Sequence, residues 1–557
     1  MPNTTPPVQP QQFDALVVGA GFAGLYALHK LRDQMGLRVR VYEAGGGVGG
    51  TWYWNRYPGA RCDIESHQYS YSFSEALQQE WRWSEKYAAQ PEILRYLEHV
   101  AERFDLKRDI TFDTRISGAR FDEANNQWIL EVAGQAVARA PFLISALGTL
   151  SAPKPPEYPG FDSFRGQVYV TGTWPHEGVD FTGQRVAVIG TGASGVQAIP
   201  EIAKQAAQLT VFQRTPNFAT PSRNGPMTAD YEQSIKSRYA ALRRQARESF
   251  GGIPFNQIQP SALAVSPEQR RQVYERCYAE GGFRLFFDSF ADLLIDPEAN
   301  RTAAEFVHEK IRSRVKNPAV AELLCPKDHP YGTKRPPLEM DYYETYNRDN
   351  VRLVDLHRTP IKAITPQGIR TTEGEHEFDS IVLATGFDAS TGPLLRMNVR
   401  GRGGLRLNDK WADGPRTYLG LAVQGFPNLF VITGPQSPSV LYNMPLAIED
   451  HVEWAADCIA YLRARGLSAI EPTLDAEDHW IAHTNEVAAG TLLPRANSWY
   501  MGANVPGKPR APLVYLGGAP AYRKICDEVA AKGYRGFVLT PGAPVAEPAG
   551  DLAPRSG

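Results

Sequence analysis

The sequence contains few cysteines, no long apolar run and no excess of charge of one sign. Its five cysteines form no Cys-x-x-Cys pair, which argues against a disulfide framework, a zinc site or a dithiol redox centre. No apolar run reaches the roughly 18–20 residues of a membrane-spanning helix. Lys and Arg number 59 and Asp and Glu 61, so the formal net charge of −2 points to neither nucleic acid nor an anionic membrane as a partner. Residues 1–12 lack the basic start and apolar core of a secretory signal, and we therefore expect a cytoplasmic protein. From the cysteine pattern we expect no metal centre.

The composition that is present belongs to a globular protein of several domains. The 557 residues are 43% hydrophobic and 22% charged, which is enough for about two to four packed domains. Short apolar runs that end in glycine recur along the chain, at 142–148, 381–386 and 429–434 among others. Runs of this kind are typical of buried parallel strands whose ends face a ligand crevice.

Two stretches of the sequence repeat one pattern of strand, helix and strand. Each pattern is a βαβ unit of the dinucleotide-binding kind. The predicted elements of the two units are, in chain order, 15–18, 23–31, 39–42, 186–189, 194–206 and 209–212. Between residues 222 and 330 the apolar residues recur at helical spacing, and Ser266-Pro267 and Asp296-Pro297 each combine an N-cap with a proline at the first helical position. We predict an α/β fold with two Rossmann-like dinucleotide-binding domains and a helical insertion.

A glycine-rich turn follows the first predicted strand. Gly19, Gly21 and Gly24 have the spacing of a tight turn that brings backbone close to a pyrophosphate at a helix N-terminus. Glu43 lies 43 − 19 = 24 residues after Gly19, at the end of the next strand, where a carboxylate accepts hydrogen bonds from a ribose. These four residues predict a dinucleotide site.

The second unit has the same turn but a cation at the acidic position. The residues of the turn are Gly190, Gly192, Ser194 and Gly195. Arg214 lies 214 − 190 = 24 residues after Gly190, and Thr215 follows it. Because a cation suits a 2′-phosphate, Arg214 and Thr215 predict a preference for NADPH over NADH. A surface Arg214 without this role is the alternative.

Two dinucleotide sites in one chain imply that a nicotinamide passes hydride to a second dinucleotide cofactor, for which flavin is the natural acceptor. We therefore predict FAD in the first unit and NADPH in the second. A disulfide reductase would need a redox-active cysteine pair, so the reduced flavin is expected to react with O₂ or a small acceptor. The predicted domains are an FAD-binding domain over 1–152 and 383–540, an NADPH-binding domain over 153–221 and 331–382, the helical insertion over 222–330, and a disordered tail over 541–557.

Two segments carry a resemblance to a known family. Residues 49–63, Gly-Gly-Thr-Trp-Tyr-Trp-Asn-Arg-Tyr-Pro-Gly-Ala-Arg-Cys-Asp, resemble the flavin-side signature of the type I Baeyer–Villiger monooxygenases. Residues 164–175 match that family's second fingerprint, Phe-x-Gly-x-x-x-His-x-x-x-Trp-Pro, except that Val170 stands in place of the His. The resemblance implies a flavin monooxygenase that uses NADPH and O₂ to convert ketones into esters or lactones, through a flavin C4a-peroxide and a tetrahedral adduct.

The resemblance also implies which residues carry the chemistry. Arg335 matches the essential arginine of the family, and its permanent charge suits an anionic peroxide and an oxyanion. Asp63 would hold that guanidinium by a charge-assisted hydrogen bond. The alternatives are a structural ion pair for Arg335 and a helix N-cap for Asp63. Because the family assigns the fingerprint His to the link between domains, Val170 is expected to affect coupling more than reaction class, and His176 is expected to be an ordinary loop residue.

Other positions match family residues one by one. The cofactor-contacting positions are Thr51, Trp52, Asp63, Tyr69, Ile116, Lys334, Met444 and Trp499, of which Lys334 matches a phosphate-binding lysine and Trp499 a mobile-loop residue. The pocket-lining positions are Thr149, Leu150, Ser439, Val440, Leu441 and Tyr442. Their apolar and partly aromatic character favours a cyclic or aryl-substituted ketone, with core packing as the alternative for each.

Two other functions are weighed against this one. A flavin monooxygenase that oxygenates nitrogen or sulfur shares both dinucleotide units, but that family lacks the Trp-Pro ending and the pair of Asp63 with Arg335. A flavoprotein that binds or senses without oxygenating is supported by Val170 alone. We expect a monomer or a weak oligomer, with a small-molecule partner and neither nucleic acid nor membrane.

Overall fold

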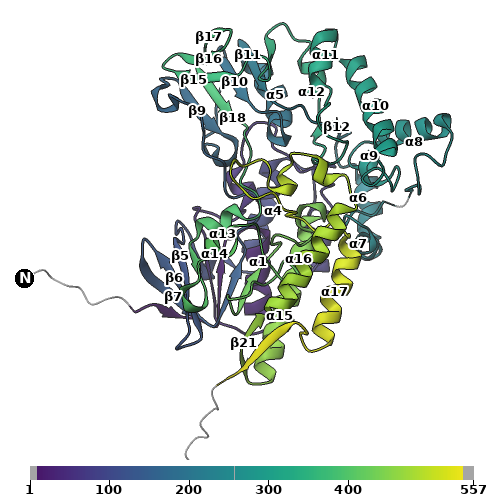
Figure 1. Cartoon of the computed structure of the whole chain (residues 1–557). Coiled ribbons are helices and arrows are strands. Elements are labelled where there is room, and N and C mark those ends of the chain that lie inside the picture. Colours follow the sequence, from purple (N-terminus) through teal and green to yellow (C-terminus); the bar gives the residue numbers. More distant parts are fainter. Residues whose placement is uncertain (1–8, 256, 543–557) are drawn as a thin grey trace, which may run out of the picture.

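The structure of the protein, a computed structural model, describes residues 9–255 and 257–542. Two lobes, each built on a parallel sheet, lie one above the other, and the C-terminal helices run along one side (Figure 1). Of the predicted tail over 541–557, Pro541 ends strand β22 (Phe537–Pro541), and residues 543–557 lie outside the described ranges.

The sheet of the first lobe has the order β20-β8-β2-β3-β4, with every neighbouring pair parallel. Its strands are β20 (Leu429–Val431), β8 (Phe142–Ser145), β2 (Ala15–Val18), β3 (Val39–Tyr42) and β4 (Ile110–Thr111). Helices α1 (Phe22–Leu28) and α15 (Met444–Ala464) pack against each other beside it. The apolar runs end as strands before their glycines, because the chain turns away from the sheet there toward the crevice.

The sheet of the second lobe has the order β14-β11-β10-β18-β9 and is also parallel throughout. Its strands are β14 (Val351–Asp355), β11 (Gln208–Gln213), β10 (Arg185–Ile189), β18 (Ser380–Leu383) and β9 (Gln167–Val170). Helix α5 (Ala193–Gln205) follows β10 as predicted. Val170 lies at the end of the edge strand β9, opposite Leu383, and its half-buried side chain packs on the apolar core.

Smaller sheets complete the two lobes. A mixed sheet in the first lobe contains β1 (Gln11–Gln12), β7 (Gln135–Ala140), β6 (Gln127–Val132), β5 (Gly118–Asp122) and β19 (Val399–Arg400). An antiparallel sheet beside the second contains β15 (Ile361–Thr365), β16 (Gly368–Thr371) and β17 (Gly374–Glu377). The strand β21 (Leu467–Pro472) pairs with β22 near the C-terminus.

Two segments that join the lobes lie side by side. Lys154 N donates to Gly386 O at 3.1 Å, and Asp388 N donates to Ala152 O at 2.9 Å. Pro153 and Phe387 form an isolated antiparallel bridge between these bonds. Because both segments follow strands of the central sheets, β8 and β18, the crossing lies at the carboxyl edges of the two sheets, where dinucleotides bind.

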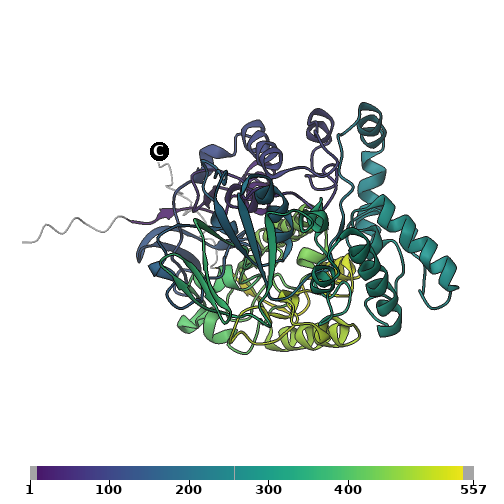
Figure 2. The same cartoon turned by 90° about the horizontal axis from the view of Figure 1, so that it is seen from above.

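The predicted insertion is helical. Its helices are α6 (Ala229–Lys236), α7 (Tyr239–Glu248), α8 (Pro267–Glu280), α9 (Arg284–Phe287), α10 (Pro297–Arg314) and α11 (Pro318–Leu324). Ser266 forms a full capping box at α8 and Asp296 caps α10, as the sequence predicts. Seen from above, these helices line one side of the molecule (Figure 2). Helix α7 reaches down to contact α17 (Ala519–Ala531) of the first lobe.

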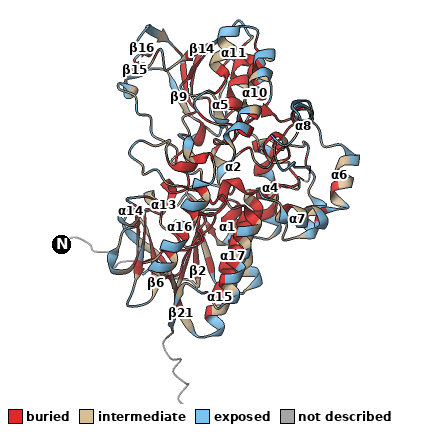
Figure 3. Ribbon diagram, turned by 45° about the vertical axis from the view of Figure 1, so that its right-hand side comes forward, coloured by how far each residue is buried: buried red, intermediate tan, exposed pale blue. Residues whose placement is uncertain are grey.

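Buried residues concentrate in the central strands and on the inner faces of the helices (Figure 3). The largest apolar cluster fills the first lobe, and a second fills the space between the second sheet and the insertion. Within the described ranges, no helix is both long and apolar enough to cross a bilayer. The same ranges contain no group of His, Cys, Asp and Glu arranged to hold a metal ion.

Candidate functional site

The turn after β2 has the geometry that a bound pyrophosphate requires. Gly19 has φ +105°, and a Cβ there would lie 2.5 Å from Ala146 O. A Cβ on Gly24 would lie 1.8 Å from Gly19 O, so glycine is needed for the close packing of α1 on the strand. Gly21 faces the Cα of Gly50, and α1 begins without a side-chain cap. The first N–H groups of the helix are therefore left for a ligand phosphate.

The turn after β10 repeats this geometry. Gly190 has φ +111°, and a Cβ on Gly195 would lie 2.2 Å from Gly190 O. A Cβ on Gly192 would meet no atom within 4 Å, so the space above this turn is open. Helix α5 also begins without a side-chain cap. Tyr57 of the first lobe donates its hydroxyl to Gln197 Oε1 of α5 at 2.9 Å, and burial raises the pKa of this phenol to about 12.

Glu43 lies under the first turn. Its carboxylate accepts from Ala20 N at 2.7 Å and from Gly45 N at 2.8 Å, and burial raises its pKa. These bonds use one lone-pair site on each oxygen, which leaves acceptor capacity for a ribose. The residues of this lobe fit the adenosine half of FAD.

Three cations gather at the edge of the second lobe. Arg214 is exposed, and Lys334 and Lys154 lie near it. Burial lowers the pKa of both lysines, and the charge of Arg214 lowers them further, against the opposing pull of Asp328 on Lys334. Like charges held together in this way favour an anion between them, and a 2′-phosphate supplies one. Thr215, whose carbonyl accepts from Thr191 Oγ1 at 3.0 Å, follows Arg214 in the same turn.

Asp63 and Arg335 form a two-bond ion pair. Arg335 Nε donates to Asp63 Oδ2 at 2.6 Å and Nη2 donates to Oδ1 at 2.9 Å. Burial by itself lowers the pKa of Arg335, but attraction by the Asp63 carboxylate outweighs it and the pKa is raised. The side chains keep 20% and 26% of their exposure, so a ligand can reach a pair that is largely removed from water. No helix begins at Asp63, which removes the N-cap alternative.

Two further groups fix the Arg335 guanidinium. Its Nη1 donates to Val440 O at 2.7 Å, and its carbon lies 4.6 Å from the centre of the Phe283 ring. The Tyr500 hydroxyl lies beside it, and its hydrogen finds no acceptor among the described residues. The guanidinium is thus held by one residue from each of several distant segments, and its direction is fixed in advance of ligand binding.

The loop that carries Trp499 is tied to the crossing between the lobes. Lys508 Nζ donates to Asp388 Oδ1 at 2.6 Å, and Asn504 Nδ2 donates to Phe387 O at 2.9 Å. Lys154 Nζ in turn donates to Asn504 O at 3.1 Å. Trp499 itself is half-buried, with its ring 4.4 Å from that of Tyr500. The loop is therefore placed over the crossing and next to Arg335.

The remaining predicted cofactor contacts lie along the first lobe. Thr51 begins the short helix α2 (Thr51–Trp54), and Trp52 is buried with its Nε1 donating to Tyr69 Oη at 3.1 Å. Ile116 is buried in the core around β2, and Met444 begins α15. Of the pocket pair, Thr149 is buried and accepts from Ser390 N at 3.1 Å, and Leu150 is half-buried.

The predicted pocket loop divides into two parts. Val440 and Leu441 pack in one apolar cluster with Tyr500, close to Arg335, and Ser439 is fully buried with its hydroxyl on Thr433 O. Tyr442 packs in a different cluster, and its hydroxyl donates to Asp450 Oδ2 at 2.9 Å. The structure thus brings Val440 and Leu441 to Arg335 and ties Tyr442 to α15 and the insertion.

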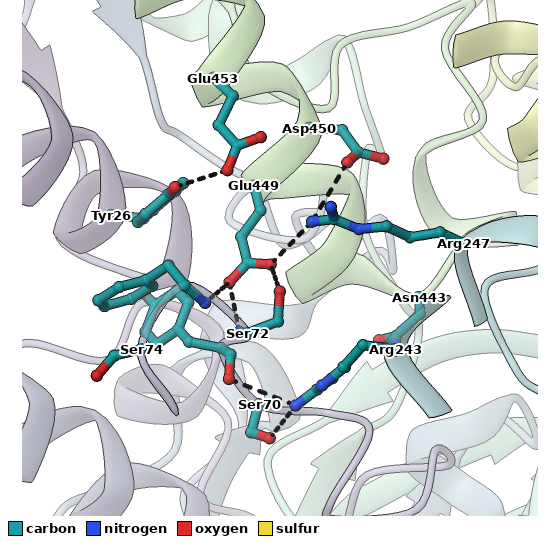
Figure 4. Close-up of polar contacts among 12 residues, drawn as sticks. Tyr26, Ser70, Ser72, Ser74, Arg243, Arg247, Asn443, Glu449, Asp450 and Glu453 are labelled. Atoms are coloured by element: carbon teal, nitrogen blue, oxygen red, sulfur yellow. Dashed lines mark hydrogen bonds and ion pairs between the residues drawn. The ribbon is translucent and has the colours of Figure 1, made fainter. Parts of the chain in front are cut away.

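A buried polar network anchors the insertion beneath this loop (Figure 4). Arg243 of α7 donates to Gln68 O at 2.9 Å and to Ser70 Oγ at 2.8 Å, and Gln68 O also accepts from Asn443 Nδ2 at 2.9 Å. Glu449 of α15 is fully buried and accepts from Phe73 N at 3.1 Å. The insertion and the start of α15 are therefore bonded to the same carbonyl group, Gln68 O, next to the pocket loop.

Several of these residues are absent from the sequence-based prediction. Tyr500, Lys508, Lys154 and Phe283 lie in loops or the insertion, and Arg243 lies on a helix that carries no motif. Only Tyr500 had a local signal that could have pointed to the site, because it directly follows the predicted Trp499. His176, predicted to be an ordinary loop residue, lies with its ring 4.6 Å from that of Tyr53 across the two lobes.

Comparison with known proteins places this arrangement in a family. Residues 16–274 match the family model described as pyridine nucleotide-disulphide oxidoreductase, although all five cysteines of this chain are buried and unpaired. The acetone monooxygenase (methyl acetate-forming) of a Gordonia species is 46% identical over 529 residues, which cover 95% of this chain and 99% of that protein. The chain is a flavin- and nicotinamide-dependent oxygenase by its fold and site.

Solved structures agree over almost the whole chain. An oxidised steroid monooxygenase bound to NADP matches with a TM-score of 0.91 and 54% identity, covering 96% of this chain and 100% of that one. OTEMO in complex with FAD and NADP matches with a TM-score of 0.92 and 44% identity at the same coverage. The chain belongs to the type I Baeyer–Villiger monooxygenases, the FAD- and NADPH-dependent family that inserts one oxygen atom next to a ketone carbonyl to give an ester or a lactone.

Proposed function

We propose that this enzyme oxygenates cyclic and aryl-substituted ketones at Arg335, which is oriented by Asp63. The observation that carries the proposal is the two-bond pair of Asp63 with Arg335 at 2.6 and 2.9 Å, next to the apolar side chains of Val440 and Leu441. An apolar wall binds the hydrocarbon part of a ketone, and a fixed cation binds its oxygen.

The division of labour among the residues follows from their chemistry. FAD, when reduced by NADPH, supplies the electrons that activate O₂. Arg335 stays protonated throughout and stabilises negative charge at the substrate oxygen, while Asp63 keeps the Arg335 guanidinium in one orientation. Arg214, Thr215 and Lys334 hold the 2′-phosphate of NADPH, and Trp499 covers the cofactor and keeps water out.

We also propose that the enzyme works in the cytoplasm as a monomer or weak oligomer. Support comes from the pair of Asp63 with Arg335 and its neighbours Val440 and Phe283, because all four residues belong to one chain. Sedimentation of the FAD-loaded enzyme tests the oligomeric state. A single stable oligomer at micromolar concentration would contradict it.

A panel of substrates tests the reaction. The FAD-loaded enzyme is supplied with NADPH, O₂ and one of cyclohexanone, a phenyl ketone, a phenyl sulfide or a tertiary amine, and mass spectrometry scores the gain of one oxygen atom. We expect the two ketones to be converted fastest and to give a lactone and an ester. Faster oxygen gain by the sulfide or the amine than by either ketone would favour heteroatom oxygenation instead.

A further inference from the structure

The hydroxyl of Tyr500 is a buried polar group for which the described part of the chain supplies no hydrogen-bond acceptor. Tyr500 is 1% exposed, and its hydroxyl hydrogen finds no acceptor among the residues in the described ranges. An unpaired buried hydroxyl lowers the stability of a folded protein, and native structures keep few of them. A ligand that accepts a hydrogen bond at this point would remove the penalty.

The backbone around Tyr500 holds the ring in one place. Tyr500 lies in the short 3₁₀ turn η8 (Trp499–Met501), and its N donates to Ser498 Oγ at 3.2 Å. Its backbone carbonyl oxygen accepts from Leu513 N at 2.8 Å, and its ring lies against that of Trp499. Because the ring is fixed by these contacts, the direction of the hydroxyl is set before any ligand binds.

The hydroxyl lies beside the guanidinium of Arg335. Burial raises the pKa of Tyr500 to about 12 even though the positive charge of Arg335 lowers it, so the phenol stays protonated at neutral pH. Of the five N–H bonds of the Arg335 guanidinium, three go to Asp63 and Val440, which leaves two. Two kinds of donor, N–H of Arg335 and O–H of Tyr500, therefore lie next to each other with free hydrogens.

The surroundings define what these donors can bind. The apolar side chains that cluster with Tyr500 include Val440, Leu441, Val514 and Leu516. A group that satisfies two donors inside an apolar wall is an oxygen that only accepts hydrogen bonds and is attached to a hydrocarbon frame. A ketone carbonyl has this chemistry, and an alcohol or a carboxylic acid would bring a donor of its own.

We propose that Tyr500 is a second hydrogen-bond donor of the oxygenation site and binds the carbonyl oxygen of the ketone beside Arg335. The inference rests on the proposed function of Arg335 and assigns a catalytic residue to it. Tyr500 keeps its proton during the reaction, and its hydrogen bond strengthens as negative charge develops on the bound oxygen.

Removal of the hydroxyl tests the proposal. In Tyr500→Phe we expect kcat/KM for cyclohexanone to fall by roughly 10- to 100-fold, mostly through kcat, because the bond is strongest to a developing negative charge. The rate at which NADPH reduces the bound FAD without ketone should stay within about twofold. A kcat/KM within twofold of the wild type, or an equal loss in the rate of FAD reduction, overturns the proposal.

A matched control comes from another buried tyrosine. Tyr274 is 2% exposed, lies in the insertion, and has a hydroxyl that pairs with Thr302 Oγ1 at 2.7 Å. Tyr274→Phe removes another buried tyrosine hydroxyl, one that lies in the insertion and already has a partner. We expect it to leave kcat/KM unchanged, and a loss equal to that of Tyr500→Phe would show a general effect of core tyrosines and overturn the assignment.

A label on the ring tests the contact without removing it. We would introduce 3-fluorotyrosine at position 500 alone, saturate the oxidised FAD-loaded enzyme with NADP⁺ and add cyclohexanone, which does not react without NADPH. We expect the ¹⁹F resonance to shift with the ketone. A resonance that responds to NADP⁺ but not to the ketone assigns the hydroxyl to the cofactor and overturns the proposal, whether or not Tyr500→Phe folds.

The two proposals fail in different ways. If Tyr500 has no role while Arg335→Ala abolishes ester formation, the inference about Tyr500 is wrong and the proposed function stands. If Arg335→Ala forms ester at the wild-type rate, the site itself is wrong and both proposals fall.

Discussion

Asp63 and Arg335, 272 residues apart in the sequence, meet edge to edge with Nε 2.6 Å from Oδ2 and Nη2 2.9 Å from Oδ1. Asp63 comes from the first lobe, and Arg335 follows the insertion in the segment that leads into the second. The orientation of the guanidinium therefore depends on how the two lobes are joined. The binding of a substrate oxygen by Arg335 therefore depends both on the bonds to Asp63 and on the way in which the two lobes are joined.

Loss of the Asp63 charge should slow oxygenation and leave reduction intact. Asn at position 63 keeps one acceptor but removes the charge that holds the Arg335 guanidinium. We therefore expect kcat for cyclohexanone to fall on the order of 10- to 100-fold in Asp63→Asn. Stopped-flow reduction by NADPH should be unchanged. Glu85→Gln, which breaks the neighbouring pair with Arg61, is the control and should keep kcat. Equal kinetics of the two variants would show that Asp63 has no special role.

Discrimination between NADPH and NADH should depend on Arg214. Without its guanidinium the 2′-phosphate loses a charge-assisted contact, and we expect KM for NADPH to rise about 10- to 100-fold in Arg214→Ala while KM for NADH changes little. Arg165 is an exposed arginine two residues before the edge strand β9 and provides the control. A KM for NADPH that is the same in Arg214→Ala and Arg165→Ala would remove Arg214 from the phosphate site.

The network of Figure 4 should contribute strongly to stability. Arg243 is buried and bonded to Gln68 and Ser70, and its charge offsets that of buried Glu449. We expect Arg243→Met to lower the free energy of unfolding by about 3–5 kcal/mol, because it removes two buried hydrogen bonds from a charged group, which contribute about 1.5–3 kcal/mol each. Arg244→Met changes the next, exposed residue of the same helix and should lie within about 0.5 kcal/mol of the wild type. Chemical denaturation of the FAD-loaded enzyme compares them, and similar midpoints would argue against the network.

A buried histidine should make stability depend on pH. His451 accepts from Thr433 N at 2.9 Å, and burial lowers its pKa to about 3. A group whose folded pKa is depressed contributes stability that is present above the unfolded pKa of about 6.5 and is lost as pH falls toward the folded value.

From pH 7 to pH 5 this histidine alone should cost roughly 2 kcal/mol. We therefore expect the Tm of the wild type to fall further over this range than that of His451→Gln. His479→Gln, at an exposed position of helix α16 (Leu474–Ala489), should follow the wild type. Parallel curves for all three proteins would contradict the assignment.

The two dinucleotide units could be predicted because their signals are local. The strands at 15–18 and 39–42 agree with the structure residue for residue, and the glycine turns and the caps at Ser266 and Asp296 depend on neighbouring residues only. The pairing of Asp63 with Arg335 followed from a family resemblance, since no periodicity relates two loops so far apart.

The rest of the site could not be predicted from local pattern. Tyr442 and Val440 are two residues apart, yet they pack in separate clusters because the loop turns between them. The bonds from Lys508 and Asn504 to the crossing join loops that carry no helix or strand period. Val170 satisfies the pattern of an edge strand, so its packing is predictable, but its effect on coupling between the lobes stays a prediction.

The most direct test of the central claim is single-turnover oxygenation by Arg335→Ala. The enzyme is reduced by NADPH, mixed with O₂ and cyclohexanone, and the lactone is counted per FAD. We expect reduction at close to the wild-type rate and lactone formation slower by on the order of 10²–10³ or more, as for the loss of an oxyanion donor. Lactone formation within tenfold of the wild type would contradict the claim that this guanidinium stabilises the reacting oxygen.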